Sequence, residues 1–365
     1  MLLVDYRTVV GRREETKIWA ENGITVQRLA SNEFDGEHKQ NGAFYLCVLW
    51  AVSLVAKITN SVQAFCRFLQ KDKSSVWNAI KAGNFKKAAK RFVFIWVTTS
   101  LEMGRDQNHV SSFFVDRFSR YNHQAKWGAA GWKSLDIFYN YWERVKPQLM
   151  DNWEGRLTRY WIERMENRQA VTNRLKIAVN LLSDALSLSK FSNGPEIRLL
   201  SIASGSAQAV IQTMKRCPGL NIKAVLIDSD QTALDEAKKS IEEAGLADKF
   251  KLKLGKTEIL EEVCKTFQPH VVEMIGFLDY RPDEKAIQLI GRIRNVLQRG
   301  GVFITCNIRR NPERFFLHWV LIWPPMVYRS ASQLGKLIVG GGFMEEKTKL
   351  FYEPFEIHGL AVAVK

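Results

Sequence analysis

Two periodicities divide the chain. From about residue 43 to 190, apolar residues recur at the three- and four-residue spacing of helices, as in SLDIFYNYWERVKPQL at 134–149. From Ile197 onward, short runs rich in β-branched residues alternate with helical stretches. This change of pattern predicts a mainly helical N-terminal domain over residues 1–155 and an α/β domain over residues 156–365.

The α/β half is predicted to consist of repeated strand–helix units. Strands are expected at 198–203, 223–228, 249–255, 270–276 and 301–308, with helices near 207–216, 231–244, 257–267 and 283–298 between them. Strands that alternate with helices form a parallel sheet covered by helices on both faces. Two more strands, at 347–354 and 355–365, lie close enough to pair antiparallel. The expected fold class is therefore α/β, a doubly wound, mostly parallel sheet preceded by a mainly helical domain.

The N-terminal half carries two further element signals. In TKIWAENGITVQRL at 16–29, β-formers flank Asn22-Gly23, which is typical of a hairpin with a tight turn. A long helix is expected over 157–189, because the apolar residues there keep one helical face and Asn193-Gly194-Pro195 supplies stop signals just beyond.

Two apolar runs raise the question of membrane contact. The run AFYLCVLWAVSLVA at 43–56 has no charge, but its 14 residues fall short of the ~20 that a spanning helix needs. We therefore expect a buried core helix here in preference to an interfacial one. The run FVFIWVTT at 92–99, however, follows a basic segment at 81–91, and basic residues beside aromatic-rich runs are typical of membrane-surface elements. A peripheral membrane contact stays open.

The formal net charge is +15, and the excess is concentrated in the first half. Residues 1–190 contain 29 Lys and Arg against 18 Asp and Glu, whereas residues 191–365 contain 24 against 20. A basic surface attracts any polyanion, whether nucleic acid, an anionic membrane or a phosphorylated substrate, and it also occurs as a merely solvated face. The charge alone does not choose among these partners.

The cysteines and histidines argue against disulfide and metal frameworks. The five cysteines are widely spaced and form no C-x-x-C pair, which favours reduced thiols. The six histidines show neither H-x-x-x-H nor H-E-x-x-H spacing, so we expect no metal-dependent mechanism. Residues 1–15 lack the basic-then-apolar order of a signal peptide. Together these features predict a cytoplasmic protein.

The decapeptide LLSIASGSAQ at 199–208 ends the first predicted strand in a turn of very small residues. These residues are Ala203, Ser204, Gly205, Ser206 and Ala207. In an open α/β sheet the ligand lies beyond the carboxyl ends of the strands, and a cofactor can approach the backbone only where side chains are small. Asp228, followed by Ser229, ends the next strand 23 residues after Gly205, a spacing that suits a carboxylate bonded to both ribose hydroxyls.

Over roughly residues 160–365 the chain resembles class I S-adenosylmethionine-dependent methyltransferases. The resemblance rests on the element order, the small-residue turn, the acidic end of the second strand and the terminal strand pair. The resemblance implies S-adenosylmethionine as the cofactor. The family motif D/E-x-G-x-G-x-G aligns with Ser201–Ala207, where only Gly205 is kept. Ser201 cannot pair with the methionine ammonium as an acid would, and alanines replace the outer glycines, a mild change unless those positions need a positive φ.

The resemblance also implies roles for individual residues. In the family, the end of the fourth strand faces the transferred methyl group, and the helix before the first strand often closes over the cofactor. The implied cofactor contacts are Ser201, Ala203, Ser204, Gly205, Ser206, Asp228, Ser229, Gly276 and Arg174, although Arg174 on a solvated helix face is an open alternative. The candidate catalytic residues are Asp279, Tyr280, Tyr328 and Arg329.

The segment NIRRNPERFFLHWVLIWPPMVYRS at 307–330 is similar to a poorly characterised bacterial branch of these methyltransferases, with an Asn-Pro after strand five and a Trp…Tyr-Arg-Ser stretch. Its aromatic residues are suited to wall a substrate chamber in which Arg329 orients an anionic group. In the alternative interpretation, helices pack here and Arg329 bonds to the protein's own carboxylates.

The leading hypothesis is an S-adenosylmethionine-dependent methyltransferase whose small-molecule or lipid-like acceptor is enclosed between the N-terminal helices and residues 307–330. One alternative is an RNA methyltransferase, suggested by the basic first half but less favoured because no recognisable RNA-binding motif is present. The other is a non-catalytic methyltransferase-like binding or scaffold protein, suggested by the altered glycine motif. The oligomeric state does not follow from the sequence.

Overall fold

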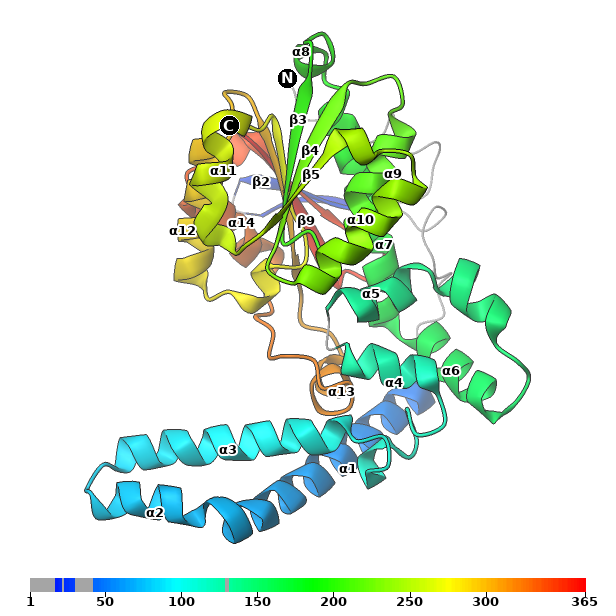
Figure 1. Cartoon of the computed structure of the whole chain (residues 1–365), viewed down its shortest axis with the longest axis vertical. Coiled ribbons are helices and arrows are strands. Elements are labelled where there is room, and N and C mark those ends of the chain that lie inside the picture. The colour runs from blue at the N-terminus through cyan, green and yellow to red at the C-terminus, as the bar shows by residue number, and fades with distance from the viewer. Residues whose placement is uncertain (1–16, 22, 30–41, 129–130) are drawn as a thin grey trace. The chain divides into compact units, whose positions relative to one another are not determined.

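The computed structural model describes residues 17–21, 23–29, 42–128 and 131–365 (Figure 1). Two sequence predictions lie outside the described residues: the lack of a signal segment in residues 1–15, and the placement of Asn22 in the predicted turn.

The described chain divides into two compact units. The sheet unit contains Glu166–Asn311, Met326–Lys365 and the two strands near the N-terminus. The helical unit contains the described residues of Lys39–Met165 together with Pro312–Pro325. The predicted boundary between residues 155 and 156 therefore needs correction, because each unit takes up a segment from the other side of it.

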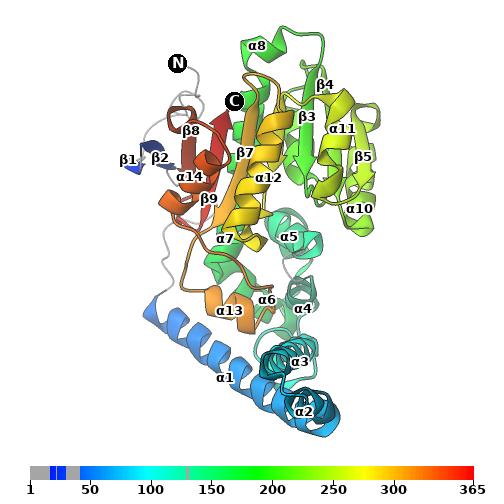
Figure 2. The same cartoon turned by 90° about the vertical axis from the view of Figure 1, so that its left-hand side faces the viewer.

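One nine-stranded sheet forms the core of the sheet unit (Figures 1 and 2). Its strands are β1 (Lys17–Glu21), β2 (Ile24–Arg28), β3 (Ile197–Ile202), β4 (Ile222–Asp228), β5 (Phe250–Leu254), β6 (Val271–Met274), β7 (Val302–Ile308), β8 (Thr348–Tyr352) and β9 (His358–Val364). The spatial order is β1-β2-β8-β9-β7-β6-β3-β4-β5. Neighbours from β5 to β7 run parallel, whereas β9 is antiparallel to both β7 and β8. The predicted fold class and the predicted C-terminal strand pair are confirmed.

Helices cover both faces of this sheet (Figure 1). On one face lie α7 (Glu166–Leu186), α9 (Gln208–Arg216) and α10 (Gln231–Glu243), and on the other α11 (Leu260–Phe267), α12 (Asp283–Val296) and α14 (Ala331–Gly340). Short helices complete the unit: α8 (Ser189–Ser192), η6 (Ala247–Lys249), η7 (Thr257–Ile259), η8 (Leu278–Tyr280) and η9 (Glu345–Lys347). Because alternate side chains of a strand point to opposite faces, β3, β4, β6, β7, β8 and β9 each contribute to both cores.

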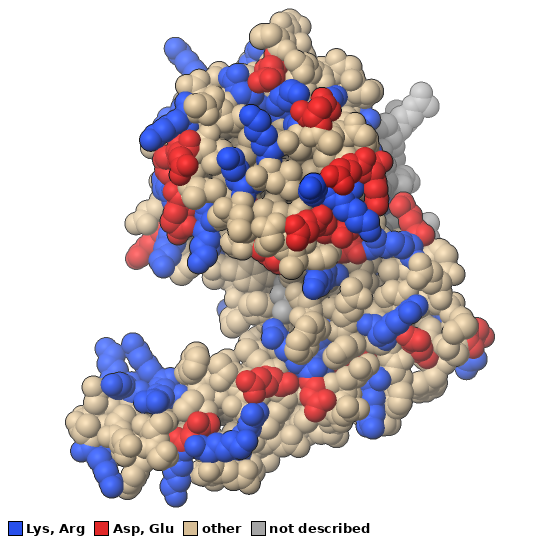
Figure 3. All heavy atoms as spheres, in the orientation of Figure 1, with Lys and Arg blue, Asp and Glu red and all other residues tan. Residues whose placement is uncertain are grey.

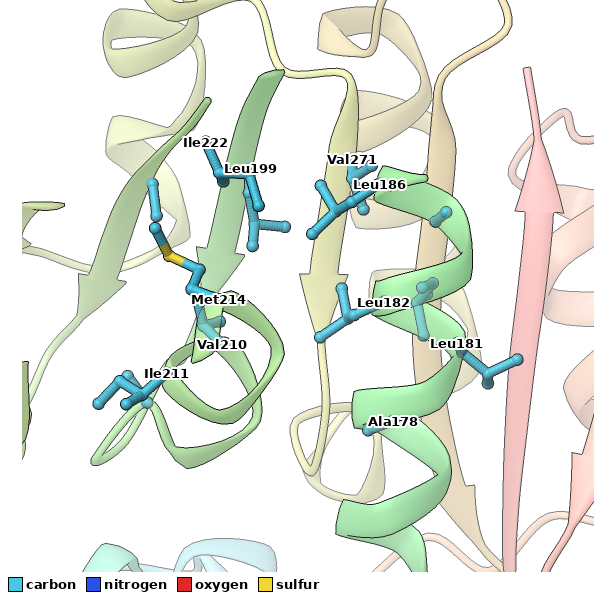
Figure 4. Close-up of a cluster of buried hydrophobic side chains, with 14 of the residues drawn as sticks. Ala178, Leu181, Leu182, Leu186, Leu199, Val210, Ile211, Met214, Ile222 and Val271 are labelled. Carbon is cyan, nitrogen blue, oxygen red and sulfur yellow. The ribbon is translucent and has the colours of Figure 1, made fainter. Parts of the chain in front are cut away.

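The direction of α7 matters for the site. Figure 4 shows Leu186 of α7 beside Val271, the first residue of β6, whereas Leu182 and then Ala178 lie progressively farther along the strand direction. The helix therefore runs opposite to the parallel strands, and its residues before Ala178 lie toward the carboxyl ends of those strands. Polar side chains on the first half of α7 are thereby carried to the edge of the sheet where ligands bind.

The predicted hairpin exists, but it belongs to the sheet unit. β1 and β2 pair antiparallel around Gly23, whose φ is 78°. β2 also pairs in parallel with β8, placing Thr25 opposite Lys349. A two-stranded hairpin alone is marginally stable in water, and here Ile24 and Val26 are buried in the core shared with α14. That burial explains why the hairpin extends the sheet and does not join the helical domain.

The helical unit contains no strand among its described residues. Its elements are α1 (Ala43–Arg67), the π-helix η2 (Phe68–Asp72), α2 (Lys73–Lys81), α3 (Phe85–Arg105), η3 (Val110–Ser112), α4 (Arg120–Trp127), α5 (Trp132–Tyr139), η4 (Tyr141–Val145), η5 (Lys146–Gln148), α6 (Trp153–Arg164) and α13 (Arg314–Trp319). Trp161 of α6 stacks on Phe316 of α13 with ring centroids 4.8 Å apart. This stack shows why residues 312–325 belong to the helical unit.

The predicted helix over 157–189 is interrupted. Met165 has φ −65° and ψ 113°, an extended conformation, and separates α6 from α7. Its side chain is buried at 2% exposure, so the break places an apolar group inside the protein. The two helices also belong to different units, which a continuous apolar face does not reveal.

The expectation of a buried core helix over 43–56 is wrong. These residues begin α1, which is 25 residues long and buries only one narrow stripe. Phe44 is 76% exposed and Trp50 is 61% exposed. The absence of charge indicated a core position, but here it reflects apolar side chains that face outward.

The segment 307–330 does not behave as one lid. Residues up to Asn311 continue from β7 in the sheet unit, residues 312–325 pack within the helical unit, and Met326 returns to the sheet unit. Within the helical unit, Trp323 lies 6.0 Å from Phe138 by ring centroids. The aromatic residues of this segment are therefore divided between two cores.

Candidate active site

The order of the strands reverses between β3 and β6. The chain proceeds from β3 outward to β4 and β5, and then crosses back to place β6 on the other side of β3. The loops that follow β3 and β6 consequently leave the sheet in opposite directions, and in open α/β sheets ligands bind in the crevice so formed. The loops at 203–207 and 275–280 flank this point.

The turn after β3 keeps the backbone shape of a glycine loop despite its alanines. Ala203, Gly205 and Ala207 have φ values of 54°, 54° and 56°. The alanine substitutions are therefore not mild, because each alanine adopts a left-handed conformation that costs an L-residue about 1–2 kcal/mol. The surrounding structure therefore keeps Ala203 and Ala207 in a backbone conformation that alanine normally avoids.

Asp228 at the end of β4 is attached to this turn. Its Oδ2 accepts a 2.8 Å hydrogen bond from the Gly205 N–H, and its Oδ1 accepts one of 2.9 Å from the Asp230 N–H. An ionised carboxylate has about four acceptor positions, so two remain for a ligand. Ser206 is buried and Ser229 is exposed. The predicted contacts after β3 and β4 thus lie at the same sheet edge.

The acid that the glycine motif lacks comes from the neighbouring strand. Ser201 on β3 is the register partner of Glu273 on β6, and the Ser201 hydroxyl donates a 2.5 Å hydrogen bond to Glu273 Oε2. The Ile275 N–H donates to Glu273 Oε1 at 3.0 Å. Burial raises the pKa of Glu273 to about 7, against the opposing effect of these hydrogen bonds and of Arg174. Glu273 is not among the residues predicted from the sequence, although a lone acid inside the apolar run VVEM is a usable signal.

Arg174 of α7 lies at the centre of the site. Its side chain is buried, and its guanidinium comes within 3.6–4.0 Å of where a Cβ on Gly276 would stand. Gly276 has a φ of 80°, which also disfavours any side chain there. Burial raises the pKa values of Glu273 and Asp279, and the positive charge of Arg174 offsets part of that rise. Arg174 is only 4% exposed, so it does not lie on a solvated helix face. This burial supports the prediction that Arg174 reaches the site.

Asp279 and Tyr280 lie in η8, directly after β6. Asp279 Oδ1 accepts a 2.7 Å hydrogen bond from the Ile308 N–H, which ties η8 to the end of β7. Burial raises the pKa of Asp279 and raises that of the Tyr280 phenol well above its usual value. The Val327 N–H donates a 2.7 Å hydrogen bond to Asp279 O, which holds the next residue, Tyr328, beside η8. Three of the four candidate catalytic residues are therefore brought together.

The fourth candidate, Arg329, has a structural role. Its five N–H donors make five hydrogen bonds of 2.5–3.0 Å to four acceptor atoms of the protein: Asp283 Oδ1 (twice), Leu278 O, Asn307 Oδ1 and Arg281 O. A guanidinium has five donors and no acceptor, so none is left for a substrate anion. The interpretation in which Arg329 bonds to the protein's own groups is the one that holds, and Arg329 fastens residues 326–330 to the sheet.

One buried histidine of the site was not predicted from the sequence. His358 begins β9 opposite Ile308, which places it at the carboxyl edge of β7. It is 3% exposed, and neither ring nitrogen has a hydrogen-bond partner in the part of the chain that the structure describes. Burial and the charge of Arg174 hold the pKa of His358 well below its usual value, so the ring is neutral. Its position was hidden because β9 is the last strand in sequence but a central one in space.

Comparison with known proteins decides the family. A family model described as "Putative methyltransferase" matches residues 131–365. The chain belongs to this methyltransferase family. Together with the class I strand order, this membership makes the protein an S-adenosylmethionine-dependent methyltransferase. The predicted family and cofactor are confirmed.

Comparison with solved structures found similar chains at low sequence identity. A protein of Bordetella parapertussis described as a possible exported protein is 16% identical, with a TM-score of 0.54 over 73% of this chain and 86% of that chain. An O-methyltransferase family protein from Burkholderia thailandensis is 14% identical (TM-score 0.41, covering 64% and 71%). The magnesium protoporphyrin IX methyltransferase of Synechocystis PCC 6803 is 13% identical (TM-score 0.43, covering 64% and 97%). No curated protein matches the sequence.

The residues at the carboxyl edge of the sheet fit this cofactor. The Ser204 hydroxyl is buried without a hydrogen-bond partner among the described residues, as expected of a group that bonds to a ligand. Asp228 supplies acceptors for hydroxyl groups, and Glu273 supplies a carboxylate for an ammonium group. Bound S-adenosylmethionine would provide the electrophilic methyl group, and these side chains would hold it in place.

Proposed function

We propose that the protein transfers a methyl group from S-adenosylmethionine to a small organic or lipid-like acceptor at the crevice between β3 and β6. The Ser201–Glu273 pair carries this proposal. It restores a carboxylate beside the glycine turn, where the motif alone has none. Without such a carboxylate the altered motif would favour a non-catalytic protein.

In this proposal each end of the cofactor meets a different strand. The ribose hydroxyls bond to the free lone pairs of Asp228, and the small residues of the turn let the cofactor approach the backbone. The methionine ammonium bonds to Glu273, and its carboxylate bonds to Arg174. Tyr280, in the loop after β6, would then be available to contact the methyl acceptor. Methyl transfer from a sulfonium needs chiefly alignment of donor and acceptor, which such fixed contacts supply.

The acceptor is proposed to lie against Tyr280 and Tyr328. Because burial raises the pKa of Tyr280, its phenol stays neutral and orients an acceptor by hydrogen bonding instead of acting as a base. Tyr280→Phe is expected to lower kcat about tenfold or more without weakening S-adenosylhomocysteine binding. Release of S-adenosylhomocysteine, followed over a panel of small phenols, carboxylic acids and lipid-like acceptors, measures this. Tight cofactor binding with no turnover on any acceptor would favour the non-catalytic alternative.

Binding of S-adenosylhomocysteine tests the cofactor contacts directly. Isothermal titration of Asp228→Asn should show at least tenfold weaker binding, because the neutral amide bonds less strongly to the ribose. Asp235→Asn is the matched control, since Asp235 is an exposed acid on α10. Equal binding by wild type and Asp228→Asn would contradict the assigned ribose contact.

A pH series tests the Glu273 contact. Because the pKa of Glu273 is about 7, the carboxylate must lose a proton before it can pair with an ammonium group. Affinity for S-adenosylhomocysteine should therefore rise between pH 6 and 7.5 with release of a proton, and Glu273→Gln should abolish the rise. 5′-Methylthioadenosine, which has no amino-acid part, should bind without this dependence. A pH dependence shared by both ligands would argue against the contact.

A further inference from the structure

The outer face of α1 reverses the usual arrangement of polar and apolar residues. The buried stripe of this helix consists of Tyr45, Leu49, Ser53, Ala56, Asn60 and Ala64, and the exposed stripe consists of Trp50, Leu54, Ile58, Val62 and Phe65, continued by Leu69 in η2. Beyond Tyr45 and Leu49, small and polar side chains thus face the protein, whereas large apolar ones face outward. Soluble surfaces rarely expose such a continuous apolar stripe, and where one occurs it marks a contact with a partner or a membrane.

A basic tip continues the exposed stripe. We use this term for residues 69–94, which comprise most of η2, α2 and the first half of α3. The tip contains the exposed cations Lys71, Lys73, Lys81, Lys86, Lys87, Lys90 and Arg91 against the single acid Asp72. Figure 3 shows Lys and Arg gathered at the end of the helical unit that carries α2. None of the seven cations is paired with an acid within the described residues. Their positive charges can therefore attract an anionic partner.

Large apolar side chains are interleaved with these cations. Trp77 is 52% exposed, Phe85 is 69% exposed and Phe94 is 67% exposed. Phe85 directly precedes Lys86 and Lys87. Protein interfaces are depleted in lysine at their cores, whereas amphipathic elements at membrane surfaces combine lysine with Trp and Phe. The composition of the tip therefore favours a lipid surface over a protein partner.

We propose that the helical unit binds the surface of an anionic membrane through the basic tip and the exposed stripe of α1. The cations attract acidic headgroups, and the aromatic and aliphatic side chains insert at the boundary between headgroups and acyl chains. A second copy of this chain is a poorer occupant, because its own basic tip would be repelled. This inference goes beyond the methyl-transfer proposal and does not depend on it.

The contact is peripheral. By length and composition alone, the helical stretch Ala43–Lys81 could cross a membrane. Against this, Lys57 interrupts its apolar residues, and one side of α1 is already buried. In α3, Arg91 and Glu102 enclose an apolar run of about ten residues, half of what a spanning helix needs. Helices lying along the membrane plane satisfy all three observations.

Vesicle sedimentation with the full chain tests the proposal, with no cofactor present. Binding should be strong to vesicles of phosphatidylcholine with 30% phosphatidylserine in about 50 mM salt, and weak to phosphatidylcholine alone. It should fall as the salt is raised, because screening weakens attraction at the surface. Equal binding to both vesicles, or binding to neither, would overturn the proposal. Since S-adenosylhomocysteine binding is measured separately, a failure here leaves the methyl-transfer proposal intact.

Two variants and one control locate the contact. Reversal of three charges of the tip, Lys86→Glu with Lys87→Glu and Lys90→Glu, should weaken binding on the order of 100-fold or more. The control Lys238→Glu with Lys239→Glu and Lys253→Glu changes the net charge equally on the sheet unit and should stay within about threefold of wild type. Trp77→Ser with Phe85→Ser and Phe94→Ser should reduce binding even at low salt, because no side chain remains to insert.

The other occupants are distinguished by their own results. If the tip variant lost retention on single-stranded RNA while vesicle binding was unchanged, the basic tip would be a nucleic-acid surface and the proposal would fail. If sedimentation equilibrium showed a stable dimer that Trp50→Ser with Ile58→Ser dissociates, while vesicles did not bind, the stripe would be an interface between copies.

Discussion

The two units depart from ordinary burial in opposite directions. At the carboxyl edge of its sheet, the sheet unit buries Glu273, Asp279 and Arg174, each at no more than 5% exposure. The helical unit instead exposes the apolar stripe of α1 and the aromatic residues of the basic tip. Charges are normally outside and large apolar groups inside, so each departure costs free energy in the isolated chain. Such departures coincide with places where a ligand or partner completes the environment.

Burial of charge alone does not identify a ligand site. In the helical unit, Lys126 and Asp116 are both buried, and they pair with each other at 3.0 Å. Ser112 accepts a further hydrogen bond from Lys126, and His123 bonds to the second oxygen of Asp116. This group satisfies itself. The buried groups at the sheet edge differ because Ser204 and His358 have polar atoms that no described residue satisfies.

The largest expected effect separates a buried structural charge from an exposed one. Arg329→Ala removes five hydrogen bonds and leaves buried acceptors unpaired, so it should lower the free energy of unfolding by about 3–5 kcal/mol. Arg292→Ala breaks an exposed ion pair with Glu261 and should cost less than about 1 kcal/mol. Urea unfolding of both variants measures the difference. If Arg329→Ala lowered the free energy of unfolding only slightly, Arg329 would again be a candidate for contact with the substrate.

The next effect compares apolar residues on the two units. Leu182→Ala empties a position fully buried against the sheet (Figure 4) and should cost about 3 kcal/mol. Ile58→Ala, on the exposed stripe of α1, should change stability by less than about 0.5 kcal/mol because Ile58 is already 52% exposed. A comparable loss for both, in thermal or urea unfolding, would mean that a surface of the protein itself covers the stripe in solution.

The third effect is a pH dependence confined to the sheet edge. The pKa of Glu273 is raised from 4.5 to about 7, so its neutral form stabilises the fold below pH 4.5 and this contribution is lost as the pH rises through 7. Ionisation of Glu273 should lower the free energy of unfolding of the wild type by at most about 3 kcal/mol between pH 5 and 8, and Glu273→Gln should not show this decrease. Glu353, whose pKa is also about 7, keeps its own dependence in both proteins. Parallel stability curves for wild type and variant would contradict the assignment.

The smallest effect concerns the left-handed turn. Ala203→Gly should stabilise the protein by about 1 kcal/mol, because glycine adopts a φ of 54° without the steric cost that alanine incurs. Ala209→Gly, inside α9, is the control and should destabilise by a similar amount. Both are measured by thermal unfolding. Destabilisation by both substitutions would show that the turn is not under strain.

The sequence predicted the sheet unit far better than the helical unit, for a physical reason. Strand–helix alternation is a local pattern, and the handedness of βαβ connections leaves few ways to assemble it. The small-residue turn and Asp228 were found because both stand at strand ends. Glu273 and His358 were missed because their positions depend on which strands are neighbours. The bonding of Arg329 was only one of two interpretations, since its acceptors lie on distant segments.

For the helical unit, the sequence predicted the helices but not how they are placed. Periodicity gave its helices but not the direction in which α1 faces, because both stripes of that helix contain apolar residues. The extended Met165 left no mark in the periodicity either. The hairpin was recognised by Asn22-Gly23, yet only the pairing of β2 with β8 shows to which unit it belongs.

The hydrogen bonds of residues 326–330 also determine how slowly this segment opens. The Val327 N–H donates to Asp279 O at 2.7 Å and the Arg329 N–H donates to Ile308 O at 3.0 Å, so this stretch without helix or strand is bonded like part of the sheet. Amide protons in irregular segments commonly exchange with solvent quickly, because the segments open by themselves. Here opening requires the end of β7 to separate as well. The amides of Val327 and Arg329 should therefore exchange as slowly as those of the sheet edge, and Tyr328 between them should keep its position through each catalytic cycle.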